Sequence, residues 1–122
     1  MSKKEKARTQ IRPRLRITSG KDIALGPGKV ELLEAVQQAG SISKAAKGMG
    51  MSYMRAWTLI RTMNHSFREP LVATVRGAVK GGGGAHLTKT GREVLMLYQQ
   101  ISSKFVGAIQ PEWRQLQRLL RS

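Results

Sequence analysis

Residues 40–66, which read GSISKAAKGMGMSYMRAWTLIRTMNHS, decide the fold of this chain. Ser41 and Ser52 each precede a stretch that can form a helix, and a serine oxygen at a helix start accepts a hydrogen bond from the free backbone amides there. Gly50 lies between the two stretches and tolerates the backbone of a sharp turn. The sequence therefore predicts a helix-turn-helix over 41–66.

Small side chains support this prediction. Two helices joined by a sharp turn must approach each other closely, and large side chains at their contact would keep them apart. Alanines at positions 45 and 46 mark the contact face of the helix expected at about 42–48, and Ala56 marks that of the helix expected at about 53–66. We expect these faces to pack together.

A further helix is expected before this unit, at about 28–39. Leu32, Leu33 and Val36 fall on one face of it, and Gly40 can end it in a left-handed conformation. The three helices together would form a compact core. Aliphatic side chains and methionine must fill much of that core, because aromatic residues make up only 5% of the chain.

A β-hairpin is predicted over 71–87, after the three helices. The segment 71–76 is rich in β-branched residues and is typical of a short strand, and 85–87 is a plausible returning strand. Gly81–Gly84 lie between them and are expected to form a flexible loop, with Lys80 at its mouth. A basic hairpin that follows a helix-turn-helix indicates a wing.

The N-terminal part divides into an arm and a strand. Residues 1–10 are basic and are expected to be a disordered arm that either contacts DNA phosphates or is simply solvated. Apolar and arginine residues alternate over 11–18, which indicates a half-buried strand. Pro13 cannot donate to a ladder and so places that strand at a sheet edge, and 19–22 is a turn signal.

The C-terminal part is expected to form helices over 91–121. Thr90 and Glu93 match a capping box that would start the first helix near Gly91, and Thr88 is a competing cap. Pro111 is expected to break this helix and to begin the next one.

The long helix carries an apolar seam. Val94, Tyr98, Ile101, Phe105 and Ala108 are spaced by four, three, four and three residues, which is heptad-like and suits contact between helices. One interpretation is a homodimer interface formed by these five residues. The other is that the seam packs on its own domain, and the spacing does not decide between them.

The charge of the chain indicates a polyanionic partner. Lys and Arg number 22 against 7 Asp and Glu, which gives a net charge of +15. Nucleic acid is the leading partner because neutralised phosphates release counterions, and an acidic membrane surface is the second. No apolar run approaches the roughly 20 residues of a membrane span, and no signal peptide is evident. We therefore expect a cytoplasmic, nucleoid-associated protein that does not bind membranes.

The third helix is the predicted reader of double-stranded DNA, with its N-terminal half against the bases of the major groove. Arg55 is the candidate base reader because its guanidinium can bind guanine O6 and N7 together, and Arg61 is expected to meet phosphate. Trp57 can belong to the core or contact DNA. The predicted DNA contacts, wing included, are Ser41, Ser52, Tyr53, Met54, Arg55, Trp57, Thr58, Arg61, Arg76, Lys80, Gly81, Gly82, Gly83 and Gly84.

The stretch 26–101 resembles the N-terminal DNA-binding domain of ModE-type, molybdate-responsive transcription regulators, which have a LysR-like helix-turn-helix. The strings GSISKAAKGMGMSYMRAW, TMN, KGGGGA and LTKTG carry the resemblance. It implies a winged helix, a homodimer and an operator with two-fold symmetry, with the third helix from Ser52 as the groove reader and 76–84 as the wing. Family members carry C-terminal molybdate-binding domains, and the chain ends at Ser122, so molybdate binding is not expected.

Other chemistries find little support. A zinc site needs three or four ligands, and the chain has two histidines, His65 and His86, and no cysteine. No framed acid–base pair or nucleophile is recognisable, so we expect no cofactor, no metal and no enzymatic activity. A nonspecific nucleoid-type or RNA-binding winged-helix protein remains an alternative, as does a protein-interaction module.

The predicted fold class is α+β and mostly helical. It is a winged helix-turn-helix with an N-terminal strand, a β-hairpin wing and a long C-terminal dimerisation helix, in a single domain over 11–122. The predicted function is sequence-specific regulation of transcription, with repression by occlusion favoured over activation.

Overall fold

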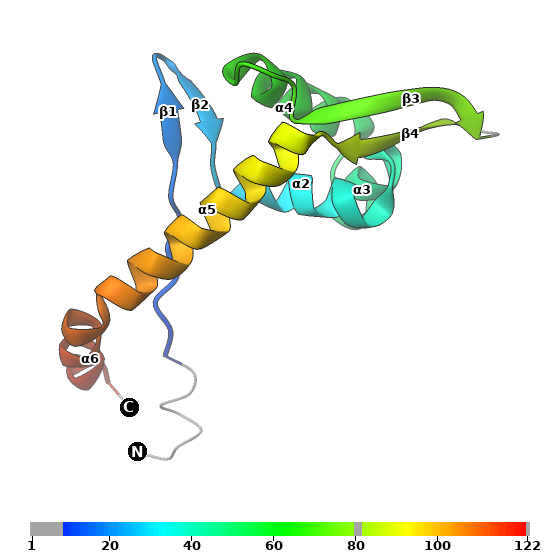
Figure 1. Cartoon of the computed structure of the whole chain (residues 1–122). Helices are drawn as coiled ribbons and strands as arrows, with labels where there is room; N and C mark the ends of the chain where they lie inside the picture. The colour runs from blue at the N-terminus through cyan, green and yellow to red at the C-terminus, as the bar shows by residue number, and fades with distance from the viewer. Residues whose placement is uncertain (1–8, 80–81, 122) are drawn as a thin grey trace.

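The computed structural model describes residues 9–79 and 82–121, and its helices and strands form a winged helix-turn-helix followed by a helical tail (Figure 1). The elements in chain order are β1 (Ile17–Ser19), β2 (Asp22–Leu25), α2 (Pro27–Ala39), α3 (Ile42–Gly48), α4 (Tyr53–Ser66), β3 (Val72–Val79), β4 (Gly82–Leu87), α5 (Lys89–Ala108) and α6 (Gln110–Leu119).

The three helices α2, α3 and α4 form the core as predicted. Gly40 ends α2 with φ 74°, and its N–H donates to the Val36 carbonyl. Gly50 makes the turn between α3 and α4 with φ 67°, a conformation that only glycine adopts without strain. The core side chains are Leu25, Val30, Leu32, Leu33, Val36, Ile42, Ala45, Ala46, Ala56, Ile60, Met63, Leu71, Val72, Ala85, Leu87, Leu95 and Tyr98.

Strands β3 and β4 form the wing, an antiparallel hairpin with Val72 opposite Leu87 and Val75 opposite Gly84. The wing is fixed to the core where the Ala85 N–H donates to the Gly40 carbonyl at 2.8 Å. The prediction of a loop through Gly84 was wrong, because β4 begins at Gly82. Gly82 lies opposite Val79 and Gly84 opposite Val75, with an irregular register between them, so pairing with β3 overrides the low strand propensity of glycine. Lys80 and Gly81 lie outside the described residues.

The N-terminal strand is shorter than predicted. Residues 11–16 belong to no strand, and pairing begins only at Ile17, where β1 meets β2 in a short antiparallel hairpin. Burial still alternates along this segment as predicted. Ile11, Pro13 and Leu15 are half-buried, and the arginines between them are exposed. The segment finds side-chain packing but no ladder partner.

Helix α5 begins at a different cap from the capping box. The Thr88 hydroxyl oxygen accepts a hydrogen bond from the Gly91 N–H at 2.9 Å, so the competing cap is the one used. Thr90 is not the cap, because its hydroxyl donates to the Glu69 carboxylate at 3.0 Å. Gly91 packs so closely on Leu71 that a Cβ there would lie 2.9 Å from the Leu71 carbonyl carbon. No side chain fits at this crossing.

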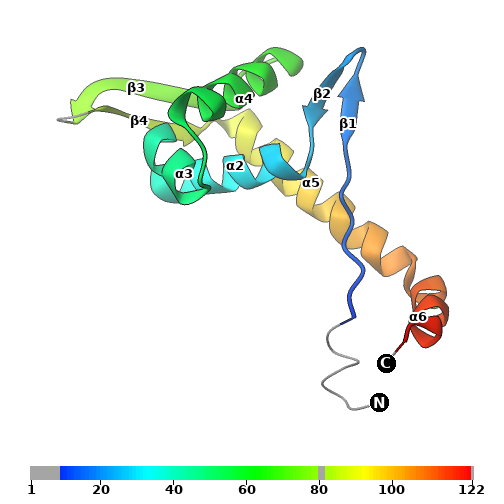
Figure 2. The ribbon, with the colours of Figure 1, turned by 180° about the vertical axis from the view of Figure 1, so that it is seen from behind.

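Helix α5 leaves the three-helix core, and its second half extends away from it towards α6 (Figures 1 and 2). Pro111 lies in the first turn of α6, as predicted. None of the described residues of α6 is buried. The tail therefore does not form a core of its own.

Candidate nucleic-acid interface

The outer face of α4 is an open stripe of mixed chemistry. Met54, Trp57, Thr58, Arg61 and His65 recur at helical spacing and are all exposed. The opposite face buries Ala56, Ile60 and Met63 completely or nearly so. The core thus holds the helix rigidly and presents a thioether, an indole, a hydroxyl, a guanidinium and an imidazole outward.

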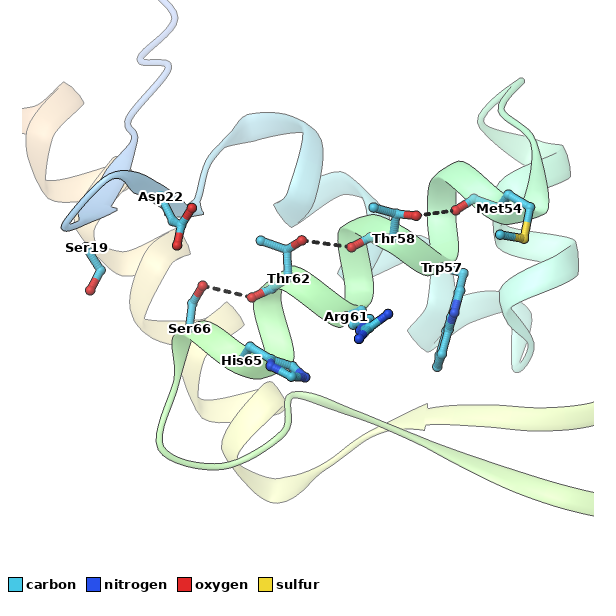
Figure 3. Close-up of a pocket in the computed structure, with 9 residues that line it drawn as sticks. All are labelled: Ser19, Asp22, Met54, Trp57, Thr58, Arg61, Thr62, His65 and Ser66. Atoms are coloured by element: carbon cyan, nitrogen blue, oxygen red, sulfur yellow. Dashed lines mark hydrogen bonds between the residues drawn. The ribbon is translucent and has the colours of Figure 1, made fainter.

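A hollow of about 590 Å³ runs along this stripe (Figure 3). Its far wall comes from the β1–β2 hairpin, which contributes Ser19 and Asp22 opposite Thr62 and Ser66 of α4. The complete lining is Ser19, Asp22, Met54, Trp57, Thr58, Arg61, Thr62, His65 and Ser66.

Hydroxyl groups along α4 are used within the helix itself. Thr58, Thr62 and Ser66 each donate to the carbonyl four residues earlier, at 2.8, 2.9 and 2.8 Å respectively (Figure 3). Each hydroxyl has one hydrogen, so its remaining capacity is to accept. In this arrangement Thr58 suits a donor such as a base amino group better than a phosphate oxygen.

Both predicted serine caps are formed. Ser41 accepts from the Lys44 N–H and Ser52 from the Arg55 N–H, each at 3.1 Å. These two hydroxyls therefore fix where α3 and α4 begin. Each oxygen keeps a hydrogen with which it can still donate.

The remaining predicted residues of α4 lie at its first turn. Tyr53 is 50% exposed and Arg55 is also exposed, but neither lines the hollow. Trp57 is 38% exposed and lines the hollow, so it is a surface residue and not a core residue.

The wing residues are only partly described. Gly82, Gly83 and Gly84 lie in β4 and Arg76 lies in β3. Lys80 and Gly81, the predicted tip, fall outside the described residues.

An asparagine that the sequence analysis missed joins α4 to the wing. The Asn64 side-chain oxygen accepts from the backbone N–H groups of Leu71 and Val72 at 2.8 and 3.1 Å, and its amide nitrogen donates to the Val72 carbonyl at 3.1 Å. One side chain thus fixes the C-terminal half of α4 to the start of the wing. The TMN string contained the signal, but only the fold shows its partners.

The predicted seam of α5 divides into two parts. Val94 packs against the core, and Tyr98 is buried with its hydroxyl donating to the Leu15 carbonyl at 2.7 Å. Burial raises the pKa of Tyr98, and the positive charge of nearby Arg14 opposes the shift. Ile101, Phe105 and Ala108 are exposed.

More apolar side chains lie open on the same tail. Leu97 of α5 is exposed, and so are the leucines of and just after α6, with Leu119 exposed by 83%. We call the exposed set the tail face; it comprises Leu97, Ile101, Phe105, Leu116, Leu119 and Leu120.

Over residues 9–79 and 82–121, no group of three or more His, Cys, Asp or Glu side chains is placed to hold a metal ion. Within the same residues, no helix has the length and apolar character to cross a membrane.

Sequence comparison decides the family. The model of bacterial regulatory helix-turn-helix proteins of the lysR family matches residues 28–92, which cover α2 to the start of α5. The chain belongs to this family. The matched segment contains both the α4 stripe and the wing, and so the candidate interface lies inside the family's characteristic domain.

The relatives include ModE proteins of several bacteria. The chain is 37% identical over 101 residues to the molybdenum transport protein ModE of Azotobacter vinelandii, a match that covers 83% of this chain and 37% of that protein. It is 41% identical over 76 residues to the DNA-binding transcriptional dual regulator ModE of Escherichia coli K12, covering 62% of this chain and 29% of that protein. The chain therefore spans about a third of these relatives' length.

A solved structure has the same fold. The DNA-binding domain in the crystal structure of a CbnR–DNA complex superposes with a TM-score of 0.53, covering 73% of this chain and 94% of that one. The two sequences are 19% identical. The likeness establishes the winged-helix fold.

Proposed function

We propose that this chain is a sequence-specific regulator of transcription that binds double-stranded DNA. The observation that carries the proposal is the exposed stripe of α4, a capped helix held rigidly by the core and accompanied by a wing. The net charge of +15 supports it, because phosphate neutralisation supplies much of the affinity for DNA. The regulatory family supports it as well.

In the proposed complex α4 lies in the major groove. Its N-terminal half approaches the base edges, where Arg55 pairs with guanine and Thr58 accepts from a base amino group. Arg61 binds phosphate at the groove edge. The wing follows the sugar-phosphate backbone through Arg76, Lys80 and the glycines that follow.

Two copies are proposed to bind one operator. The tail face is a set of exposed apolar side chains on α5, on α6 and just after it, and burial of such surface drives association. Ile101, Phe105 and Ala108 of the predicted seam belong to the contact, while Val94 and Tyr98 support it from inside their own chain. A two-fold dimer would place its recognition helices in successive grooves, about 34–36 Å apart.

Occupancy of DNA by this domain is proposed to be the regulatory event, and repression by occlusion is the form we favour. A protein bound across a promoter blocks polymerase without any further contact. We also propose that DNA binding by the described domain is independent of molybdate. Added molybdate is then expected to leave the affinity for a bound duplex unchanged.

Selection from a random duplex library at near-physiological salt, followed by sequencing of the bound pool, tests the proposed function. An enriched sequence with two-fold symmetry is the expected result. Tight, salt-dependent binding without enrichment would instead indicate the nonspecific nucleoid-type alternative, and preference for RNA in a competition assay would indicate the RNA-binding one.

A further inference from the structure

The β1–β2 hairpin stands beside the DNA-reading helix and has no part in the function proposed so far. Helix α4 lies between this hairpin on one side and the outer part of the wing on the other, and the two opposite views of the chain agree on this arrangement (Figures 1 and 2). The hairpin is therefore placed to meet any duplex that α4 enters, on the side that the wing does not reach.

The end of the hairpin is a tight two-residue turn. Ser19 pairs with Asp22, which leaves Gly20 and Lys21 as the turn residues. Gly20 has φ 61°, and a positive φ at the first turn position is the glycine geometry of a turn that matches the twist of the flanking strands. All four residues are exposed, so the turn presents a cation and an open backbone at a well-defined place.

The hairpin and the α4 stripe border the same open hollow. Ser19 and Asp22 form one side of it, and Arg61, Thr62 and Ser66 lie on the other (Figure 3). This end of the stripe is its C-terminal half, where a recognition helix leaves the bases and passes the phosphates. A backbone strand that follows Arg61 along the groove edge would next meet the hairpin turn.

The charges around the hairpin favour this contact. Burial lowers the pKa of the Lys29 amine, and Asp22, the one carboxylate of the turn, lies close enough to oppose that shift. The Lys29 amine also donates to the carbonyl of Ile23, the β2 residue that follows Asp22. The Lys29 ammonium thus offsets the charge of the Asp22 carboxylate. Lys21 then supplies the remaining charge at the end of the turn.

We propose that the β1–β2 hairpin is a second wing, whose residues Ser19, Gly20 and Lys21 hold the sugar-phosphate backbone of duplex DNA on the side of α4 opposite the β3–β4 wing. The proposal rests on the proposed function. Lys21 supplies the cation, Ser19 a hydroxyl donor, and Gly20 lets the phosphate approach without a Cβ in the way.

Backbone cleavage by a tethered reagent tests the placement. The chain has no cysteine, so Ser19→Cys gives a unique thiol to which an iron chelate can be attached. Ser103→Cys, at an exposed position of α5, is the matched control. On a duplex of about 30 base pairs, three helical turns, Ser19→Cys is expected to cut the backbone at the flank of the bound site and Ser103→Cys is not. Equal cutting by the two would overturn the second wing.

The salt dependence of binding tests the charge. Lys21→Ala is expected to weaken binding several-fold without changing base preference and to reduce the slope of log affinity against log salt by about one. Arg114→Ala removes one cation from α6 and is expected to keep the wild-type slope. Identical slopes for the two variants would contradict the second wing and leave the proposed function intact. A wild-type chain that binds no duplex at all would overturn both.

Discussion

The two halves of this chain differ in the side chains that they leave exposed. From β2 to the first turns of α5, large apolar side chains such as Leu32 and Met63 are completely buried, and the exposed face of α4 carries mixed polar and apolar groups. Beyond Tyr98 the chain exposes Ile101 by 50% and Phe105 by 45%. Helix α5 belongs to both halves, since Leu95 is buried in the core and Ile101 is open.

The difference shows which contacts the chain can complete alone. The helix-turn-helix and its wing close one core within a single chain, and the mixed face of α4 that stays exposed is the face we propose for DNA. The tail face is not covered in this way by its own chain, because none of the described residues of α6 is buried. Exposed apolar surface of this kind marks an interaction site, and the partner we propose for it is a second copy of the chain.

The largest expected effect breaks the tail without touching the core. Ile101→Glu places a charge in the tail face, so we expect a monomer in sedimentation at micromolar concentration. Operator affinity should then fall at least about 100-fold, because the second half-site no longer binds as a linked partner. Ser103→Glu, on the same helix, adds the same charge and should stay dimeric. A dimeric Ile101→Glu would remove the tail face from the account.

The next effect disturbs the contact between the start of α5 and the core. Gly91→Ala is expected to lower the free energy of unfolding by about 3 kcal/mol, because its methyl group would collide with the Leu71 backbone. Gly107→Ala, later in α5, meets nothing within 4 Å and should be neutral or stabilising by up to about 1 kcal/mol. Denaturant titration compares them. Equal stability of the two variants would mean that α5 can shift away from Leu71.

A third variant tests the link between helix and wing. Asn64→Ala leaves the Leu71 and Val72 backbone groups without their side-chain partner, which should cost about 2 kcal/mol of stability. We also expect weaker DNA binding even where the protein is fully folded, because the wing is no longer fixed to α4. Full operator affinity in the folded variant would show that the wing is positioned by β4 alone.

The smallest effect concerns the N-terminal segment on the tail. Tyr98→Phe removes the hydrogen bond to the Leu15 carbonyl and should cost about 1 kcal/mol at neutral pH. The raised pKa of Tyr98 means that the folded state favours the neutral phenol, so this stability is complete below pH 10 and is lost as the pH rises above it. Urea titrations at pH 7 and above pH 10 should show a smaller loss in Tyr98→Phe than in wild type. The same loss in both would exclude Tyr98 as the titrating group.

The sequence was sufficient where structure is decided locally. Caps at Ser41 and Ser52 and the glycines at 40 and 50 place the helices of the core, because each acts on its own neighbours within four residues. The exposed stripe follows from the same periodicity. Pro111 marks the start of α6 for an equally local reason.

Contacts between distant segments escaped prediction. Thr88 and Thr90 are both plausible caps by sequence, and it is the Glu69 carboxylate, 21 residues away, that engages Thr90. Gly91 shows its importance only when Leu71 lies against it. The N-terminal strand shortens because β2 pairs with Ile17–Ser19 alone, and no pattern within 11–18 records the length of its partner.

The central claim is that α4 reads base sequence, and Arg55 and Arg61 on the same helix test it most directly. The measurement is the affinity of wild type, Arg55→Ala and Arg61→Ala for the selected operator and for each of its single base-pair variants. Arg55→Ala should lose about 1–3 kcal/mol through one base pair per half-site and stop discriminating there, while Arg61→Ala should weaken every duplex alike. Uniform weakening by both variants, with no base pair singled out, would contradict the claim that α4 reads sequence.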